Sequence, residues 1–173
     1  MNIFNHLMIL NLIITMLYII FFYIYAKILS NSFYSYIKNA KETDFKNPED
    51  WIKEGISNLW VACIDDMVIG LVGILPYENK SKISVKTKGN KTAELRRMYV
   101  AKEYRNMGIA SKLYEEAERW CIENGYDEIV LFTSSQIPAN IFYIRKGFEF
   151  QKRDNLGFFS LDLMTYVKRV SKK

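Results

Sequence analysis

The residues best suited to chemistry form a short glycine-containing loop in the middle of the chain. Arg105-Asn106-Met107-Gly108-Ile109-Ala110 follows an expected strand and precedes an expected helix. Backbone N–H groups at a helix start lack intrahelical partners and the helix dipole is positive there, so this loop can hold a phosphate. Gly108 and Ala110 lack bulk, and Arg105 can donate charge-assisted hydrogen bonds. The spacing is neither Walker A nor G-x-G-x-x-G, which argues against an NTPase or a dinucleotide enzyme and leaves an ordinary strand-to-helix turn as the alternative.

Composition excludes several other chemistries. The chain has 173 residues, two cysteines (Cys63 and Cys121) and one histidine, His6. The cysteines are far apart in the sequence and no CxxC occurs, which excludes a zinc cluster and a disulfide scaffold. His6 lies beside an apolar run, so no Ser-His-Asp or Cys-His nucleophile system is expected. Both cysteines fall within apolar patterns and are expected to be buried core thiols.

Charged residues are confined to one part of the chain. Lys and Arg number 24 against 19 Asp and Glu, a net charge of +5, and none of them falls within residues 1–26. Residues 7–26 form an apolar run that, at about 1.5 Å per helical residue, is long enough to cross a bilayer. A secretory signal peptide is the alternative, but the run lacks a basic n-region and a small-residue cleavage site. We therefore expect one uncleaved transmembrane helix that ends near Lys27.

Flanking cations predict the orientation of this helix. The lysines that follow it are Lys27, Lys38, Lys41 and Lys46. By positive-inside bias the domain that follows faces the cytosol. Two N-x-[ST] sequons, at 79–81 and 90–92, would favour a lumenal domain, but chance explains them equally well.

The rest of the chain alternates strand and helix patterns, with a hairpin turn at Asp65-Asp66 and a helix ended by Asn124-Gly125. The expected elements are helices at 33–41 and 48–55, strands at 59–64, 67–75 and 94–100, a helix from Ile109, a strand at 128–133, a helix at 139–146 and a strand at 158–163. This order predicts a mixed α/β fold in which the helix between two strands forms a right-handed crossover.

Three motifs follow one another in the second half of the chain. They are Glu94-Leu95-Arg96-Arg97-Met98-Tyr99-Val100, Arg105-x-x-Gly108-x-Ala110 and Phe142-Tyr143-x-x-Lys146-Gly147-Phe148. Together they resemble the GNAT superfamily of acyl-CoA-dependent N-acyltransferases, over about residues 58–166. With the hydrophobic segment upstream, the chain is most similar to the camello-type (N-acetyltransferase 8-like) membrane proteins. The resemblance implies a central mixed sheet with a cofactor-binding strand-loop-helix, preceded by one transmembrane helix.

The resemblance also implies a domain organisation and a location. We divide the chain into an N-terminal segment, 1–29, with a transmembrane helix at about 7–26, a helical connector, 30–57, and a GNAT acetyltransferase domain, 58–173. A single-pass protein of the endoplasmic reticulum is implied. The family's first strand has no convincing counterpart here, which is typical of a truncated product, an incomplete gene reading or a minimal variant.

By the same resemblance, acetyl-CoA is the co-substrate and an amine is the acceptor, with no metal and no nucleic acid. Backbone groups of Met98 and Val100 would align the pantetheine, and N–H groups from Asn106 to Ser111 would cradle the pyrophosphate. Gln136 stands where many relatives have Asn, and Asn140 is a second polar candidate. The predicted cofactor-binding residues are Met98, Tyr99, Val100, Arg105, Asn106, Met107, Gly108, Ile109, Ala110, Ser111, Gln136 and Asn140.

Two residues are predicted to be catalytic. Tyr143 corresponds to the tyrosine that protonates the departing thiolate, with a core aromatic as the alternative. Glu94 is the candidate general base, with an exposed strand residue or an ion-pair partner of Arg96 as the alternative. Arg96 and Arg97 are expected on opposite faces of their strand, where one of them can favour a carboxylate-bearing acceptor.

Three functions remain open at this point. The first is a membrane-anchored N-acetyltransferase that acts by direct transfer on a small amine, an amino acid or cysteine conjugate, or a lysine side chain. The second is a non-catalytic acyl-CoA-binding membrane module, which the missing first strand favours and the retained Tyr143 disfavours. The third is an unrelated α/β membrane protein whose loop binds another phosphate compound. The oligomeric state is not predicted.

Overall fold

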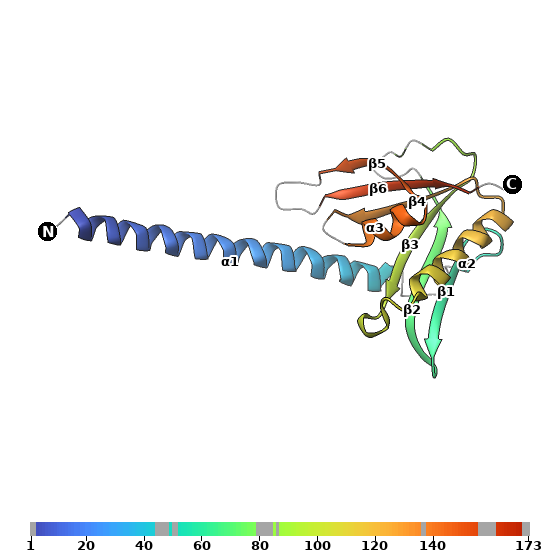
Figure 1. Ribbon diagram of the computed structural model, residues 1–173, viewed down its shortest axis with the longest axis horizontal. Coiled ribbons are helices and arrows are strands. Elements are labelled where there is room, and N and C mark those ends of the chain that lie inside the picture. The colour runs from blue at the N-terminus through green and yellow to red at the C-terminus, as the bar shows by residue number, and fades with distance from the viewer. Residues whose placement is uncertain are drawn as a thin grey trace. The chain divides into compact units, whose positions relative to one another are not determined.

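The structure is a computed structural model that describes residues 3–43, 49, 52–78, 85, 87–135, 138–155 and 162–170. It contains two compact units, one built on the N-terminal helix and the other on a sheet with its helices (Figure 1).

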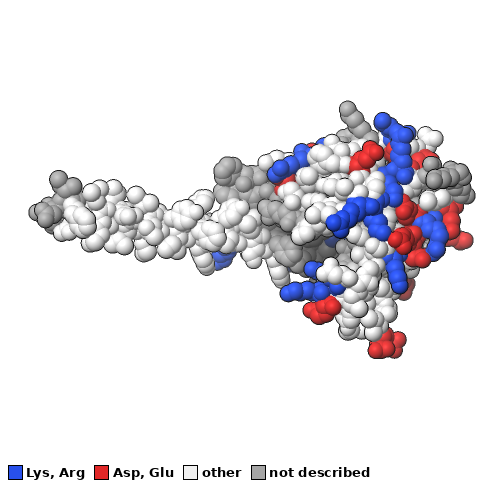
Figure 2. All heavy atoms as spheres, in the orientation of Figure 1, with Lys and Arg blue, Asp and Glu red and all other residues white. Residues whose placement is uncertain are grey.

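The first unit is a single long helix, α1 (Ile3–Thr43). Its segment Phe4–Asn31 has a mean hydropathy of 2.5 and is long and apolar enough to cross a membrane. Figure 2 shows no charged side chain along the N-terminal part of this helix. The hydroxyl of Thr15 donates to the carbonyl of Asn11 at 2.8 Å, so the helix itself satisfies this polar group. The expected helix end near Lys27 is wrong, because α1 continues without a break through the helix expected at 33–41.

The second unit is a six-stranded sheet with the order β1-β2-β3-β4-β6-β5. Its strands are β1 (Asn58–Ile64), β2 (Met67–Pro76), β3 (Thr92–Val100), β4 (Glu128–Ser134), β5 (Glu149–Asp154) and β6 (Leu163–Arg169). Among the described strands, β3 and β4 pair in parallel and the other neighbours are antiparallel. This is the predicted mixed α/β fold.

The hairpin between β1 and β2 turns at the predicted residues. Asp65 and Asp66 have φ values of +47° and +66°, which is the left-handed pair that a two-residue type I′ turn needs. A bulge between Ala62 and Cys63 shifts the register of β1. Cys121 is buried as expected, but Cys63 is exposed. The prediction of a second core thiol is wrong because β1 is an outer strand and the bulge changes its alternation just before Cys63.

The parallel connection runs from β3 through a one-turn helix, η2 (Lys102–Tyr104), and α2 (Ile109–Glu123) to β4. One face of α2 packs on the sheet through Leu113, Tyr114, Ala117 and Cys121. The helix ends at Glu123 with Asn124 as its C-cap, and Gly125 follows with a φ of +72°. Here the predicted helix and its stop signal are confirmed.

The segment before β1 differs from the prediction. Lys53 and Ser57 form an isolated antiparallel bridge around a turn in which Gly55 has a φ of +67°, so no helix runs to Gly55. The hydroxyl of Tyr126 donates to the carbonyl of Ile56 at 2.5 Å. The ammonium of Lys91 donates to the carbonyl of Gly55 at 3.2 Å. These bonds fix the turn to the residues that precede β3 and β4.

The last two strands also differ from the prediction. The expected strand at 158–163 falls mostly outside the described residues, and the sheet instead contains β5 and β6 on either side of it. The sequence of β5, EFQKRD, shows little apolar alternation. Because β5 pairs only with β6 in the described sheet, solvent reaches much of it and no apolar pattern is required.

Gly89 lies where a larger residue would have no room for its side chain. A Cβ added to Gly89 would lie 2.5 Å from the Cβ of Asp127. Asp127 cannot easily move, because its Oδ2 accepts hydrogen bonds from the backbone N–H groups of Asn90 and Lys91 at 2.8 and 3.0 Å. We expect Gly89→Ala to lower the free energy of unfolding by about 1–3 kcal/mol, measured by chemical denaturation. A decrease of the free energy of unfolding by less than about 0.5 kcal/mol would show that Asp127 moves to accommodate the methyl group.

Candidate active site

The predicted anion loop has the geometry of an open helix start. Asn106 and Gly108 both have left-handed backbones, with φ values of +63° and +79°. Gly108 is the N-cap of α2, and among the described residues no side chain caps it and no acidic residue lies in the first turn. A Cβ at Gly108 would meet no atom within 4 Å. The first N–H groups of α2 are therefore available to an anion, which the helix dipole attracts.

Strands β3 and β4 separate next to this loop. They pair only between Thr92–Leu95 and Glu128–Leu131, although β3 continues to Val100 and β4 to Ser134. The pairing of β3 with β2 shifts between Leu71 and Gly73, and Arg97 on the bulged strand has a φ of +56°. Bulges bend a strand and increase its twist. The second half of β3 thus has an edge that β4 does not pair with.

Hydrogen bonds show which residues present their backbone to this edge. The N–H of Ala101 donates to the carbonyl of Ile69 on β2 at 2.8 Å. Because backbone groups alternate in direction along an antiparallel ladder, Tyr99 also faces β2, whereas Met98 and Val100 face away from it. Consistent with this, the Nε of Arg105 donates to the carbonyl of Val100 at 2.9 Å. Because β4 does not pair with this edge, Met98 and Val100 can accept an extended ligand as an additional strand, with the carbonyl of Val100 shared with Arg105.

Tyr143 lies on the short helix α3 (Ala139–Arg145) and is only 7% exposed. Its ring makes edge-on contacts with Phe142 and Phe148, at centroid distances of 5.4 and 5.8 Å. Burial raises the pKa of Tyr143 to about 12. The phenol is therefore protonated at neutral pH and can act as a proton donor.

Five of the fourteen predicted site residues lie in or against one hydrophobic cluster. Val100 and Tyr143 belong to one hydrophobic cluster, and Met98, Ile109 and Ala110 pack against it. Tyr99 and Met107 instead expose their side chains. The ring of Tyr99 lies 5.8 Å from the guanidinium carbon of Arg105.

The two polar candidates beyond β4 have different outcomes. Gln136 lies outside the described residues. Asn140 places its Nδ2 3.4 Å from the carbonyl of Ser134. Its Oδ1 is buried and accepts no hydrogen bond from the described groups. An orphaned buried acceptor is unfavourable in the free protein and can receive an N–H from a ligand.

Glu94 forms an ion pair with Arg96, which was the alternative to its predicted role as general base. Arg96 contacts it through two parallel bonds, Nε to Oε1 at 2.7 Å and Nη2 to Oε2 at 2.9 Å. Both carboxylate oxygens are engaged, which favours the ion pair over the role of general base. The bulge at Arg97 interrupts the strict alternation from which we expected Arg96 and Arg97 to lie on opposite faces.

Sequence reasoning missed a polar cluster behind the site. Tyr114 is fully buried on α2, and its hydroxyl lies 3.0 Å from Glu118 Oε1 and 3.1 Å from Lys168 Nζ on β6. The Tyr114–Glu118 spacing of four residues puts both on one side of the helix. The partner on β6 leaves no local signal, since it is distant in sequence.

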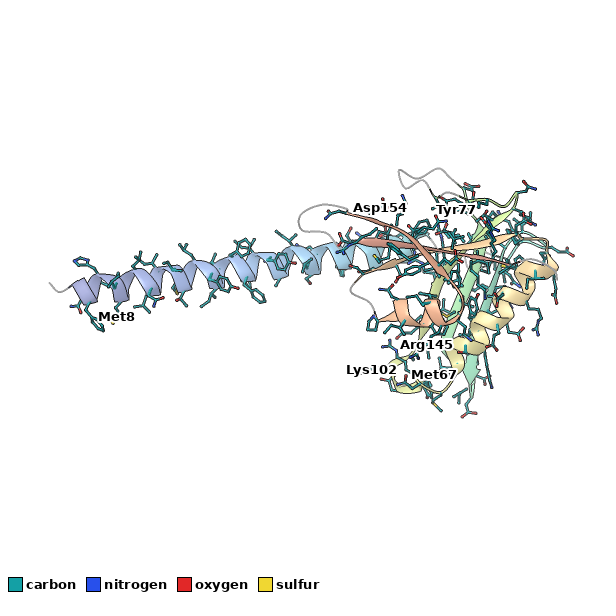
Figure 3. The ribbon with its side chains drawn as sticks, turned by 45° about the horizontal axis from the view of Figure 1, so that its top comes forward. Met8, Met67, Tyr77, Lys102, Arg145 and Asp154 are labelled. Carbon is teal, nitrogen blue, oxygen red and sulfur yellow. The ribbon has the colours of Figure 1, made fainter. Side chains whose placement is uncertain are left out.

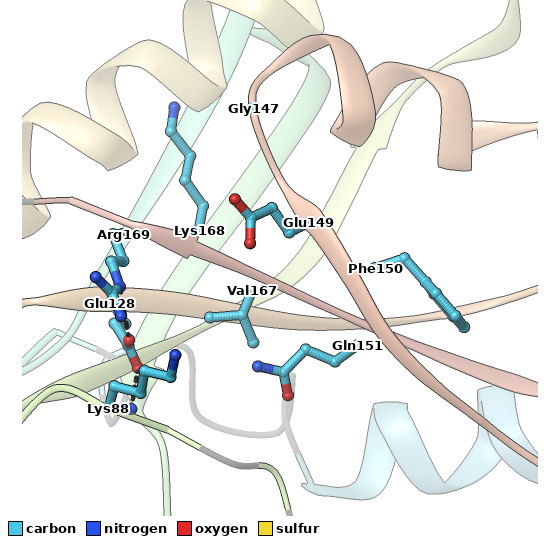
Figure 4. Close-up of a pocket in the computed structure, with 9 residues that line it drawn as sticks. All are labelled: Lys88, Glu128, Gly147, Glu149, Phe150, Gln151, Val167, Lys168 and Arg169. Atoms are coloured by element: carbon cyan, nitrogen blue, oxygen red, sulfur yellow. Dashed lines mark hydrogen bonds and ion pairs between the residues drawn. The ribbon is translucent and has the colours of Figure 1, made fainter.

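Two cavities border the second unit. The larger, about 490 Å³, contains none of the predicted site residues (Figure 4). It is lined by Lys88, Glu128, Gly147, Glu149, Phe150, Gln151, Val167, Lys168 and Arg169. The smaller, about 320 Å³, lies between β1 and the start of α2 and includes Ile109 and Leu113. In Figure 3 the labelled Arg145 marks the end of α3, the helix that carries Tyr143. We place the site by the loop and strand geometry, because neither cavity spans both.

With this geometry established, comparison with known proteins identifies the class. The model of the acetyltransferase (GNAT) family matches residues 24–150. The chain belongs to this family.

Individual members of this family are also similar to the chain. Human N-acetyltransferase 8B is 32% identical over 126 residues, which is 72% of this chain and 52% of that protein. The N-acetylaspartate synthetase of Xenopus tropicalis is 31% identical over 130 residues, 74% of this chain and 43% of that protein. The chain thus spans about half the length of the curated relatives it matches.

Solved structures share the fold. A GNAT-family acetyltransferase from Staphylococcus aureus superposes with a TM-score of 0.60 and 27% identity, over 77% of this chain and 78% of that one. A streptothricin acetyltransferase from Bacillus anthracis, solved in complex with acetyl coenzyme A, gives a TM-score of 0.57 at 20% identity, over 70% and 67% of the two chains. The six-stranded mixed sheet is therefore the GNAT fold.

Proposed function

We propose that the chain is a membrane-anchored N-acetyltransferase that moves an acetyl group from acetyl-CoA to a primary amine by direct transfer. One observation carries this proposal. The open start of α2, the part of β3 that β4 does not pair with, and Tyr143 of α3 all contribute residues to, or pack against, a single hydrophobic cluster.

The residues present fit acetyl-CoA. Its pyrophosphate requires N–H donors and positive potential, which the uncapped start of α2 supplies beyond Gly108. Its pantetheine arm is extended and carries amides, which the free edges of Met98 and Val100 can pair with. The orphaned Oδ1 of Asn140 offers a further acceptor for an amide N–H. The divergence of β3 from β4 gives that arm an entry between the strands.

Each of these groups then has a role in transfer. The loop and β3 hold the thioester so that a neutral amine attacks the acetyl carbon. A backbone N–H at Val100 stabilises the oxyanion that forms. As the C–S bond breaks, the phenol of Tyr143 donates its proton to the departing thiolate. The amine's own proton leaves to water or to a base that we leave unassigned, since Glu94 is engaged with Arg96.

The proposed anchor is the apolar segment of α1. Aromatic side chains are frequent in its second half, where Lys27 follows, with its ammonium 5.9 Å from the ring centroid of Tyr23. Aromatic residues beside a cation are typical of a bilayer interface. Lys27 and Lys38, after the apolar segment, favour a cytosolic catalytic domain. The endoplasmic reticulum membrane is the location that the resemblance to the camello-type proteins implies.

We propose an acceptor that carries a carboxylate. The name of one relative denotes synthesis of N-acetylaspartate, and Arg96 and Arg97 lie on the cofactor strand. We expect Arg96→Ala or Arg97→Ala to lower the kcat/KM ratio of an amino acid over its amide about tenfold, the effect of losing one charge-assisted hydrogen bond. Steady-state kinetics with aspartate and aspartate diamide measure this ratio. An unchanged ratio in both variants would exclude a carboxylate contact by either arginine.

A thiol-release assay tests the function itself. The full-length chain in detergent is given acetyl-CoA and a panel of amines, with reactions lacking amine as the control. Release of free thiol that depends on amine establishes the transferase and identifies its acceptor class. Bound acetyl-CoA without amine-dependent release would instead show the non-catalytic acyl-CoA-binding module.

A further inference from the structure

Tyr143 is held by a chain of ring contacts that leads to α2. Phe142 and Phe148 each contact the ring of Tyr143 edge-on. The same two rings contact Tyr114 edge-on, at centroid distances of 6.3 and 5.7 Å. Tyr114 therefore lies behind the two rings that orient the proposed acid.

Tyr114 is itself fixed by a polar triad that joins α2 to β6. Lys168 donates to its hydroxyl, its hydroxyl donates to Glu118, and the ammonium of Lys168 forms an ion pair with Glu118. Burial and the neighbouring Glu118 raise the pKa of Tyr114 far above its ordinary value, so the hydroxyl keeps the proton that it donates. All three groups satisfy one another, which is the condition under which a buried polar network rigidifies its surroundings.

Lys168 also lies close to the turn that follows α3. A Cβ added to Gly147, which follows α3, would lie 3.5 Å from Lys168 Cε. In Figure 4 the side chain of Lys168 extends toward α2 and Gly147, on the opposite side of β6 from Val167 and Arg169. Lys146 adds an ion pair with Glu115 of α2 at 2.8 Å. The helix that carries Tyr143 is thus joined to α2 by rings and by charges.

This arrangement links the two ends of the site. Gly108 and the first turn of α2 form the proposed pyrophosphate loop, and Tyr114 lies on the next turn of the same helix. We propose that Tyr114 and Lys168 are positioning residues, which set the distance between the anion loop on α2 and the hydroxyl of Tyr143 on α3. The assignment rests on the proposed acetyl transfer for its kinetic consequence, but the geometry exists independently of that reaction.

A double-mutant cycle separates positioning from general stabilisation. Tyr114→Phe keeps the ring that contacts Phe142 and Phe148 and removes only the hydroxyl of the triad. We expect kcat to fall about tenfold in the otherwise wild-type chain, with KM for acetyl-CoA unchanged. In a Tyr143→Phe background the same change should have no further effect on kcat, because the group it positions is gone. Equal falls in both backgrounds would overturn the proposal.

Tyr126→Phe is the matched control. Tyr126 is also a buried tyrosine of the same cluster, and its hydroxyl also makes a hydrogen bond, to the carbonyl of Ile56, which is not part of the triad. Its loss should reduce thermal stability as much as Tyr114→Phe does and leave kcat unchanged. A comparable fall in kcat would show that any buried hydroxyl of this core matters equally.

A spectroscopic measurement keeps this test independent of the reaction. In the full chain with 13C-labelled tyrosine, the ring signals of Tyr143 are assigned by their loss in Tyr143→Phe. We expect them to shift in Tyr114→Phe and in Lys168→Met, and to stay in place in Tyr126→Phe. Unmoved Tyr143 signals overturn the positioning proposal even if the wild-type chain transfers acetyl groups. Shifted signals in a chain without transferase activity support the positioning and refute the function.

Discussion

Replacing Tyr143 by phenylalanine is expected to lower kcat for acetyl transfer about a hundredfold, within the range that general acids contribute. The variant keeps the ring, whose edge-on contacts with Phe142 and Phe148 do not involve the hydroxyl. It loses the one proton that we assign to the departing thiolate. KM for acetyl-CoA should stay within about twofold, because binding rests on the loop and on β3 rather than on the phenol. Thiol release at saturating amine measures both constants.

The pH dependence of the wild type gives the same assignment a second test. Burial raises the pKa of Tyr143 to about 12, whereas a primary amine of the lysine type loses its proton near 10.4. The rate should therefore rise with pH as the acceptor becomes neutral, and deprotonation of Tyr143 should cause no decline below about pH 11. In Tyr143→Phe the rise should persist at the lower rate. A kcat for Tyr143→Phe within twofold of the wild type would leave Tyr143 as a core aromatic.

The parts of the site that could be predicted from sequence are those encoded by contiguous residues. The loop from Arg105 to Ala110, the hairpin turn at Asp65-Asp66 and the end of α2 at Asn124 depend on left-handed backbones and helix starts, which only a few residue types allow. These local rules predicted β3, the loop that follows it and α2 almost to the residue.

The predictions that failed concern residues whose roles depend on contacts that the sequence pattern does not determine. Whether Glu94 can be a base depends on where Arg96 reaches, which the alternation of a strand does not fix once a bulge intervenes. Tyr114 acquires its role from Lys168, 54 positions later. An edge strand such as β5 has one neighbour and needs no apolar pattern. Pairwise contacts of this kind have no signature in a single sequence.

The second large effect is expected at Gly108, whose replacement by alanine should raise the Kd for CoA tenfold or more. A methyl group there meets no protein atom within 4 Å, so it projects into the open space in front of the anion loop. The left-handed backbone at φ +79° is also unfavourable for alanine. The substitution therefore lowers the free energy of unfolding by about 1 kcal/mol. Isothermal titration of the full chain in detergent with CoA measures the affinity.

Gly125 provides a closely matched control for this prediction. It flanks the other end of α2, with a φ of +72° and likewise no atom within 4 Å of an added Cβ. Gly125→Ala should therefore lower the free energy of unfolding by the same amount, about 1 kcal/mol, and leave the Kd for CoA unchanged. Gly125→Ala therefore reports what a loss of helix stability does to CoA binding without a methyl group at the anion loop. A loss confined to Gly108→Ala locates the pyrophosphate at the start of α2, and equal affinities in the two variants would remove it from there.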